Sequence, residues 1–124
     1  MATGGEKETV MALEVTDENF EEGVLRRSEA TVVILELSAE WCEPCKDMAS
    51  LLGSVVDERP GRATLAVADI DKCPKVQSMF KVAAIPAVYA IKDRKVVTRF
   101  VGSQNGVATR DWLTEALLMT ANLQ

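Results

Sequence analysis

The order of apolar and polar residues along the chain predicts strands that alternate with helices. Residues 31–38 (TVVILELS) and 63–69 (ATLAVAD) are apolar runs of the kind found in strands that are covered on both faces of a sheet. Residues 42–58 instead place apolar side chains three and four positions apart, which is typical of an amphipathic helix. A second helix of this kind is predicted at about residues 108–121.

The remaining segments complete an α/β order. In chain order they are a strand at 11–15, a helix capped by Thr16 or Asp17 that runs to about Arg27, a short helix at 73–80, a strand that begins at Pro86, a tight turn at 92–94 and a strand that ends at Gly102. The last two strands are predicted to pair as an antiparallel hairpin. The result is a mixed central sheet of about five strands flanked by about four helices. Four methionines are expected to fill gaps in the core: Met11, Met48, Met79 and Met119.

The composition is that of an ordinary globular domain. A chain of 124 residues with 48% apolar and 27% charged residues is long enough to bury one core. We expect a single domain at residues 10–124 after a flexible tail at residues 1–9. The net charge of −5 argues against a surface that binds nucleic acid.

The chain is also expected to have no membrane partner, because no apolar run approaches the length of a membrane span. The first ten residues, MATGGEKETV, lack the apolar segment of a secretory signal. We therefore expect a cytoplasmic location, where thiols stay reduced and paired cysteines usually serve chemistry.

The candidate chemistry lies in the sequence WCEPC, which holds two of the chain's three cysteines. Cys42 and Cys45 stand three positions apart where a strand passes into a helix, so we expect their Cα atoms about 5–6 Å apart, within the range of a disulfide. At the helix N-terminus, unpaired N–H groups and the helix dipole favour the thiolate of Cys42. Pro44 has no backbone N–H, but this loses no hydrogen bond because N–H groups in the first turn of a helix have no partner within the helix. The pattern predicts an exposed, activated thiol at Cys42 and a shielded partner at Cys45.

Two other interpretations of these cysteines are weaker. A zinc site normally takes about four ligands, whereas the chain has no histidine and only Cys73 besides the pair. A metal or an iron–sulfur cluster would therefore need ligands from a second chain. A pair of inert core cysteines is disfavoured because Glu40, Glu43 and Lys46 around them indicate a surface. We expect neither a metal nor a cofactor.

These residues resemble the thioredoxin family. The segment AEWCEPCK is similar to the active-site signature of that family. The segments DIDKC at 69–73, AIPA at 84–87 and FVG at 100–102 fall where its members carry similar segments. The resemblance covers about residues 10–121. It implies the thioredoxin fold and a redox-active disulfide between the two cysteines of the signature.

The resemblance also implies a groove that binds the target protein. In the family, the peptide bond that corresponds to Ile85–Pro86 is cis and faces Cys42. The backbone beside Pro86 would pair with an extended segment of the target, as in strand addition. An ordinary trans proline at the start of an edge strand is the alternative. The residues expected to bind the target are Trp41, Glu43, Pro44, Ala84, Ile85, Pro86, Val101 and Gly102.

Glu36 places a carboxylate inside the apolar run at 31–38. Burial there is costly and should raise its pKa, unless the side chain points to solvent. Thioredoxins carry an aspartate at the matching position, which implies that Glu36 transfers protons to and from Cys45. Two departures from the family affect this region: the first is expected to loosen the packing, and the second to remove a charged partner of Glu36. Ser38 replaces a common aromatic residue, and Val67 replaces a lysine that accompanies the buried acid.

Glu43 replaces the glycine that usually stands between the two cysteines. Its charge is expected to disfavour the Cys42 thiolate and to favour basic targets. Cys73 is expected to be a half-exposed bystander, with a regulatory or intermolecular disulfide as the alternative.

The predicted function is therefore that of a thiol–disulfide oxidoreductase. Its partners would be proteins that contain a disulfide, together with an upstream reductase or dithiol that supplies electrons. We expect a monomer, with a dimer linked through Cys73 as the alternative. A thioredoxin-like interaction module with little redox turnover is the alternative function.

Overall fold

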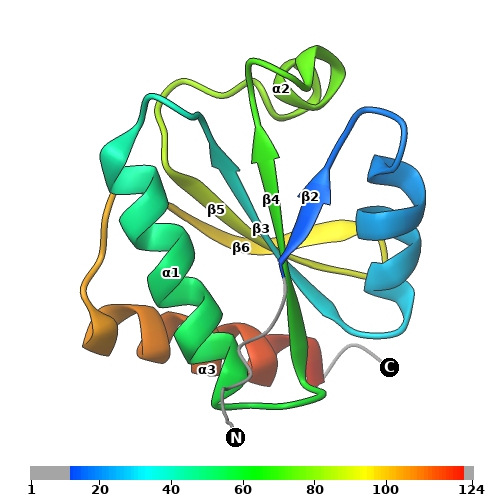
Figure 1. Cartoon of the computed structure of the whole chain (residues 1–124). Helices are drawn as coiled ribbons and strands as arrows, with labels where there is room; N and C mark the ends of the chain where they lie inside the picture. The colour runs from blue at the N-terminus through cyan, green and yellow to red at the C-terminus, as the bar shows by residue number, and fades with distance from the viewer. Residues whose placement is uncertain (1–11, 122–124) are drawn as a thin grey trace, which may run out of the picture.

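The structure is a computed structural model that describes residues 12–121. Its five strands form one mixed sheet in the order β2-β4-β3-β5-β6, and helices cover both faces of this sheet (Figure 1). The predicted α/β architecture is confirmed, with four helical segments if the adjoining η1 and η2 are taken together. In chain order the elements are β2 (Leu13–Val15), the π-helix η1 (Glu21–Arg26), the 3-10 helix η2 (Arg27–Glu29), β3 (Val32–Ser38), α1 (Glu43–Asp57), β4 (Ala63–Asp69), α2 (Pro74–Phe80), β5 (Ala87–Lys92), β6 (Lys95–Val101) and α3 (Gly106–Ala121). The predicted tail at residues 1–9 lies outside the described residues.

Strand β3 occupies the centre of the sheet. It pairs in parallel with β4 and antiparallel with β5, so both of its edges are hydrogen-bonded. Every residue from Val32 to Ser38 is buried, as the apolar run predicts. Because successive side chains point to opposite faces of a sheet, this strand contributes to two cores at once.

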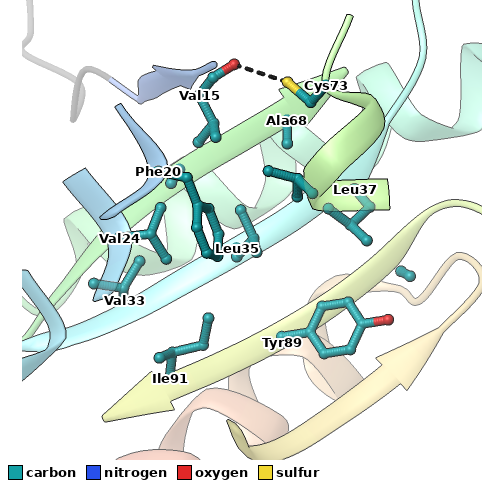
Figure 2. Close-up of a cluster of buried hydrophobic side chains, with 13 residues drawn as sticks. Val15, Phe20, Val24, Val33, Leu35, Leu37, Ala68, Cys73, Tyr89 and Ile91 are labelled. Carbon is teal, nitrogen blue, oxygen red and sulfur yellow. Dashed lines mark hydrogen bonds between the residues drawn. The ribbon is translucent and has the colours of Figure 1, made fainter. Parts of the chain in front are cut away.

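The two faces of the sheet carry separate apolar cores. On one face, Ile34 of β3 packs in a cluster with Leu52 of α1 and Leu113 of α3. On the other face, Leu35 packs in a cluster with Phe20 and with residues of α2 (Figure 2). Full burial of one such side chain contributes roughly 1.5–3 kcal/mol. The two cores therefore fix both layers of helices against the strands.

The first helical segment differs from the predicted helix. Residues Glu21–Arg26 form a π-helix that continues directly into η2. An α-helix has hydrogen bonds between residues four apart, and a π-helix has them between residues five apart. Two apolar residues four positions apart are compatible with both helix types, so the sequence pattern could not predict this difference. At the start of the segment, the N–H of Thr16 donates to Asn19 Oδ1 and the N–H of Asn19 donates to Thr16 Oγ1. Thr16 and Asn19 therefore close the turn before η1, whereas the N-cap residue of η1 is Phe20, which makes no side-chain cap hydrogen bond.

Asp17, the other predicted cap, serves a different helix. Its carboxylate accepts hydrogen bonds from the backbone N–H groups of Lys75 and Val76, each at 3.2 Å. These N–H groups belong to the first turn of α2, where a helix leaves its donors unpaired. The loop after β2 therefore holds the start of a helix that lies nearly sixty residues further along the chain.

Cys73 is fully buried, which corrects the expectation of a half-exposed bystander. Its thiol donates to the carbonyl oxygen of Val15 at 3.3 Å (Figure 2). Burial, together with the nearby carboxylates of Asp17 and Asp69, raises the pKa of this thiol. Cys73 stands directly before α2, and its side chain packs in the core on that face of the sheet.

The methionines are less buried than predicted. Met48 lies in the core, but Met79 is 57% exposed and Met119 is 40% exposed. Met11 lies outside the described residues. An isolated apolar residue on a helix does not by itself indicate which face is buried, because scattered apolar residues are also common on surfaces.

We expect Asp17→Ala to lower the free energy of unfolding by about 1–2 kcal/mol, because two N–H groups of α2 lose their acceptor. Urea denaturation of the oxidised protein measures this loss. Glu18→Ala is the matched control: it removes the same charge from an exposed neighbouring residue to which the structure assigns no hydrogen bond. Equal losses in the two variants would contradict the assignment of Asp17 as a cap.

Candidate active site

The two cysteines of WCEPC form a disulfide at the N-terminus of α1. Their Cα atoms are 5.3 Å apart, within the predicted range. Cys42 is the residue that caps α1, and its sulfur accepts a hydrogen bond from the backbone N–H of Cys45 at 3.2 Å. Pro44 lies in the first turn of the helix, as predicted. One N–H donor of the helix end, that of Cys45, is therefore directed at the Cys42 sulfur.

The two sulfurs differ little in their access to solvent. Cys42 was expected to be exposed, but it is only 6% exposed, while Cys45 is completely buried. Apolar side chains of Ala39, Ile70 and Ile85 surround the pair. The predicted difference in burial is therefore small, although its direction is as predicted. A partner that approaches from solvent can reach Cys42 alone.

Trp41 is held beside the disulfide by a residue to which sequence reasoning gave no role. Its ring is 68% exposed, yet its Nε1–H donates to Asp71 Oδ2 at 2.8 Å. Asp71 lies in the turn after β4, and its own N–H donates to Asp69 Oδ1. The segment DIDKC was noted for its similarity to a family segment, and this similarity was the one signal that could have revealed the anchor.

The Ile85–Pro86 peptide bond is cis, as the resemblance implied. The carbonyl oxygen of Pro86 accepts a hydrogen bond from the N–H of Gly102 at 2.8 Å, so the loop before β5 is joined to the residue after β6. Gly102 has a φ of +92°, a conformation that glycine adopts at little cost. Both the cis bond and this glycine therefore shape one end of the strand pair β5–β6.

The residues predicted to bind the target are only partly gathered in one place. Ala84 and Val101 line a common hollow of about 440 Å³. Val101 is 56% exposed, whereas Pro86 is buried. Trp41, Glu43 and Pro44 lie beside the disulfide on the α1 side and are not part of the lining of that hollow.

Glu36 is completely buried, and neither of its carboxylate oxygens has a hydrogen-bond partner among residues 12–121. The prediction of a buried carboxyl is confirmed, and the alternative of a side chain in solvent is wrong. Desolvation raises the pKa of Glu36 to about 8. Glu36 shares a strand face with Ile34, which packs against α1, because residues two positions apart point the same way. Its side chain therefore lies on the face that is covered by the helix that carries Cys45.

Comparisons with known proteins agree with this geometry. The sequence model of the thioredoxin family, described as "Thioredoxin", matches residues 11–115. The chain belongs to the thioredoxin family. It is 31% identical over 103 residues to a thioredoxin of Buchnera aphidicola subsp. Schizaphis graminum, which covers 83% of this chain and 94% of that protein.

Two further similar proteins carry the same name. A thioredoxin of Mycobacterium bovis is 33% identical over 103 residues, with 83% of this chain and 87% of the relative covered. A thioredoxin of Staphylococcus haemolyticus is 33% identical over 92 residues, with 74% and 85% covered. With its paired cysteines in place, this member of the thioredoxin family is a thiol–disulfide oxidoreductase of the protein-disulfide reductase type. None of the helices in residues 12–121 is long and apolar enough to cross a membrane.

Two residues that depart from the thioredoxin pattern, Ser38 and Val67, line a common hollow. Lys46 also lines this hollow, which has a volume of about 250 Å³. Val67 lies directly opposite Glu36 in the parallel register of β3 and β4, so their side chains share one face. Valine fills less space than lysine and brings no ammonium group toward Glu36. Glu36 therefore has no charged partner across the strand at this position.

Glu43 lies on the exposed surface of the first turn of α1. Its Oε2 is 3.5 Å from Nζ of Lys46, one turn further along the helix. Because both side chains are solvent-exposed, this ion pair only partly offsets the glutamate charge. A negative charge therefore stands beside the reactive pair in a position where other thioredoxins usually have glycine.

We expect the stability of the oxidised protein to fall as the pH rises from about 5 to about 8. The pKa of Glu36 rises from an ordinary value of 4.5 to about 8 on folding. Between these values the folded protein holds a proton that the unfolded chain releases, so the free energy of unfolding decreases by at most about 1.4 kcal/mol per pH unit. Urea titrations across this range measure the slope, and the disulfide removes the two paired thiols from the titration.

Two variants test whether Glu36 causes this slope. Glu36→Gln keeps the shape of the side chain and should abolish the dependence. Val67→Lys should move the fall in stability to lower pH, because an ammonium group on the neighbouring strand favours the ionised carboxylate of Glu36. A wild-type slope in Glu36→Gln would show that another group titrates.

Proposed function

We propose that this protein reduces protein disulfides through nucleophilic attack by Cys42. The observation that carries the proposal is the disulfide at the N-terminus of α1, in which the Cys42 sulfur accepts the N–H of Cys45 and Cys42 is the more exposed residue of the pair, at 6% against 0%. In the reduced protein the same N–H group and the helix end would stabilise a thiolate on Cys42.

The exchange would proceed in two balanced steps. The Cys42 thiolate attacks one sulfur of the target disulfide, so that a mixed disulfide forms and the other target sulfur leaves as a thiolate. The Cys45 thiolate then attacks the Cys42 sulfur and releases the second target thiolate. Two electrons pass to the target, and Cys42–Cys45 becomes a disulfide. An upstream reductase or dithiol must return two electrons before the next turnover.

Glu36 would exchange the proton of Cys45. A carboxyl group with a pKa of about 8 titrates in the range of ordinary thiols. It can therefore give or take a proton near neutral pH without a large energetic cost. Glu36 lies on the face of the sheet that is covered by α1, the helix that carries Cys45, and this position suits the role.

The target would lie against Trp41 and the cis-proline loop, with Ala84, Ile85, Val101 and Gly102 contributing to the surface. We further propose a single domain at residues 10–124 that acts as a monomer in a reducing, cytoplasmic compartment. A dimer linked through Cys73 would first require this thiol to leave its buried hydrogen bond with Val15.

We expect Cys42→Ser to abolish insulin reduction by the protein in the presence of dithiothreitol, whereas Cys73→Ser should retain most of it. Cys42 alone combines solvent access with the helix N-terminus, and Cys73 is buried elsewhere. The rate of insulin precipitation over the dithiothreitol background measures the activity. Comparable rates for wild type and Cys42→Ser would overturn the assignment. A wild type that does not exceed the background would favour the interaction module instead.

Glu43 is expected to make the protein a stronger reductant. In Glu43→Gln, Cys42 should lose its proton at a lower pH, because the nearby negative charge no longer opposes the thiolate. The reduction potential should become less negative, because a more stable thiolate stabilises the reduced form. Alkylation rates against pH and equilibration with glutathione measure the two quantities at low salt.

Asp47→Asn is the matched control for Glu43→Gln. It removes the same charge from an exposed position one turn further along α1. Shifts of equal size in both variants would show that the effect comes from net charge and not from the place of Glu43 between the cysteines.

A further inference from the structure

A second hollow continues from the one lined by Ala84 and Val101. It has a volume of about 480 Å³ and lies between the first helical segment, α2 and strand β6. Phe80, Tyr89 and Arg99 line both hollows. The two therefore form one groove, which we name the distal groove; it runs from Ala84 and Val101 past Arg99 to Val96.

We propose that the distal groove receives an extended segment of the target protein that carries an acidic side chain, and that Arg99 and Lys81 bind this carboxylate. The proposal deepens the proposed function and rests on it, because it assigns a preference among disulfide targets. Its occupant is a stretch of polypeptide chain, and the argument for it has three parts.

The floor of the groove is apolar and aromatic. The rings of Phe80 and Tyr89 pack with their centroids 4.7 Å apart. Met79 and Val96 line the far end and are 57% and 46% exposed, and Val101 lines the near end with 56% exposure. Large apolar side chains left in solvent along one continuous groove are typical of a surface that a partner covers.

Two positive charges border this apolar floor. Arg99 lies opposite Tyr89 in the register of β5 and β6, so its side chain shares the face of the groove. Lys81 follows α2 and lines the near hollow. Within residues 12–121 the structure assigns neither cation an ion pair or a side-chain hydrogen bond. Arg94 at the far end differs, because Glu21 and Glu29 bind its guanidinium at 2.5 and 3.0 Å. The charge that the groove offers to a ligand is therefore that of Arg99 and Lys81.

The groove begins beside the cis-proline loop and has the length of a short peptide segment. Its near end includes Ala84, next to the cis Ile85–Pro86 bond, and Val101. From Val101 to Val96 the edge strand β6 spans six residues, or about 16 Å at the rise of an extended strand. An extended target segment of about the same number of residues would fill it. The acidic Glu43 lies on the other side of the disulfide, so the two sides would attract opposite charges.

Paired disulfide peptides test the proposal. Each pair differs only by Glu or Gln placed three residues from the reactive cysteine, with one pair carrying it before the cysteine and one after. The measured quantity is the ratio of kcat/KM for the Glu peptide to that for the Gln peptide, at low salt and with excess reductant. We expect a ratio of about three to ten in one of the two pairs, because two exposed charges interact with one carboxylate. High salt should bring the ratio close to one.

Substitutions test which residues cause the preference for the Glu peptide. Arg99→Gln and Lys81→Gln should each lower the ratio by about twofold or more, and Arg99→Glu should favour a Lys peptide over the Glu peptide. Lys95→Gln is the matched control, because Lys95 is an exposed cation on the same strand that is not part of the groove lining. This variant should keep the wild-type ratio.

The outcomes separate this inference from the proposed function. If the wild type reduces neither peptide nor insulin, the proposed function fails. If it reduces both peptides of each pair at equal rates, only the acidic preference is overturned. A ratio that falls as much in Lys95→Gln as in Arg99→Gln would also contradict the inference, because the preference would then come from net charge and not from the distal groove.

Discussion

The position of strand β3 is the constraint on which the other parts of the site depend. This strand is buried at every residue and paired on both edges, so it cannot shift without breaking two ladders and two cores. Its end leads within four residues to Cys42, and its face toward α1 carries Glu36. The position of the disulfide and the burial of the acid therefore have one common cause.

The sequence allowed most of the fold to be predicted because its signals were long and periodic. The apolar run of β3 and the helical stripe of α1 each extend over many residues, and tertiary packing agrees with both. Local signals were less reliable. The type of the first helix and the cap formed by Asp17 depend on single hydrogen bonds, some to residues distant in sequence. Pattern alone does not contain that information.

For the active site, the cysteine pair and the burial of Glu36 could be predicted from the residues, because the chemistry requires that spacing and the run around Glu36 is apolar. The cis bond before Pro86 came from family resemblance alone, since spacing does not distinguish a cis from a trans proline. The anchor of Trp41 by Asp71 joins two segments thirty residues apart. The nearly complete burial of Cys42 follows from Ala39, Ile70 and Ile85, which meet only in the folded chain.

The bonds made by the loop after β2 have a consequence for recognition. Asp17 holds one end of the short helix α2, and Phe80 at the other end forms part of the floor that a target would touch. The disulfide and its helix α1 make no use of these bonds. Chemical reactivity and the choice of protein partner are thus supported by different parts of the chain. A change in the segment before η1 would alter selectivity while the thiol chemistry continued.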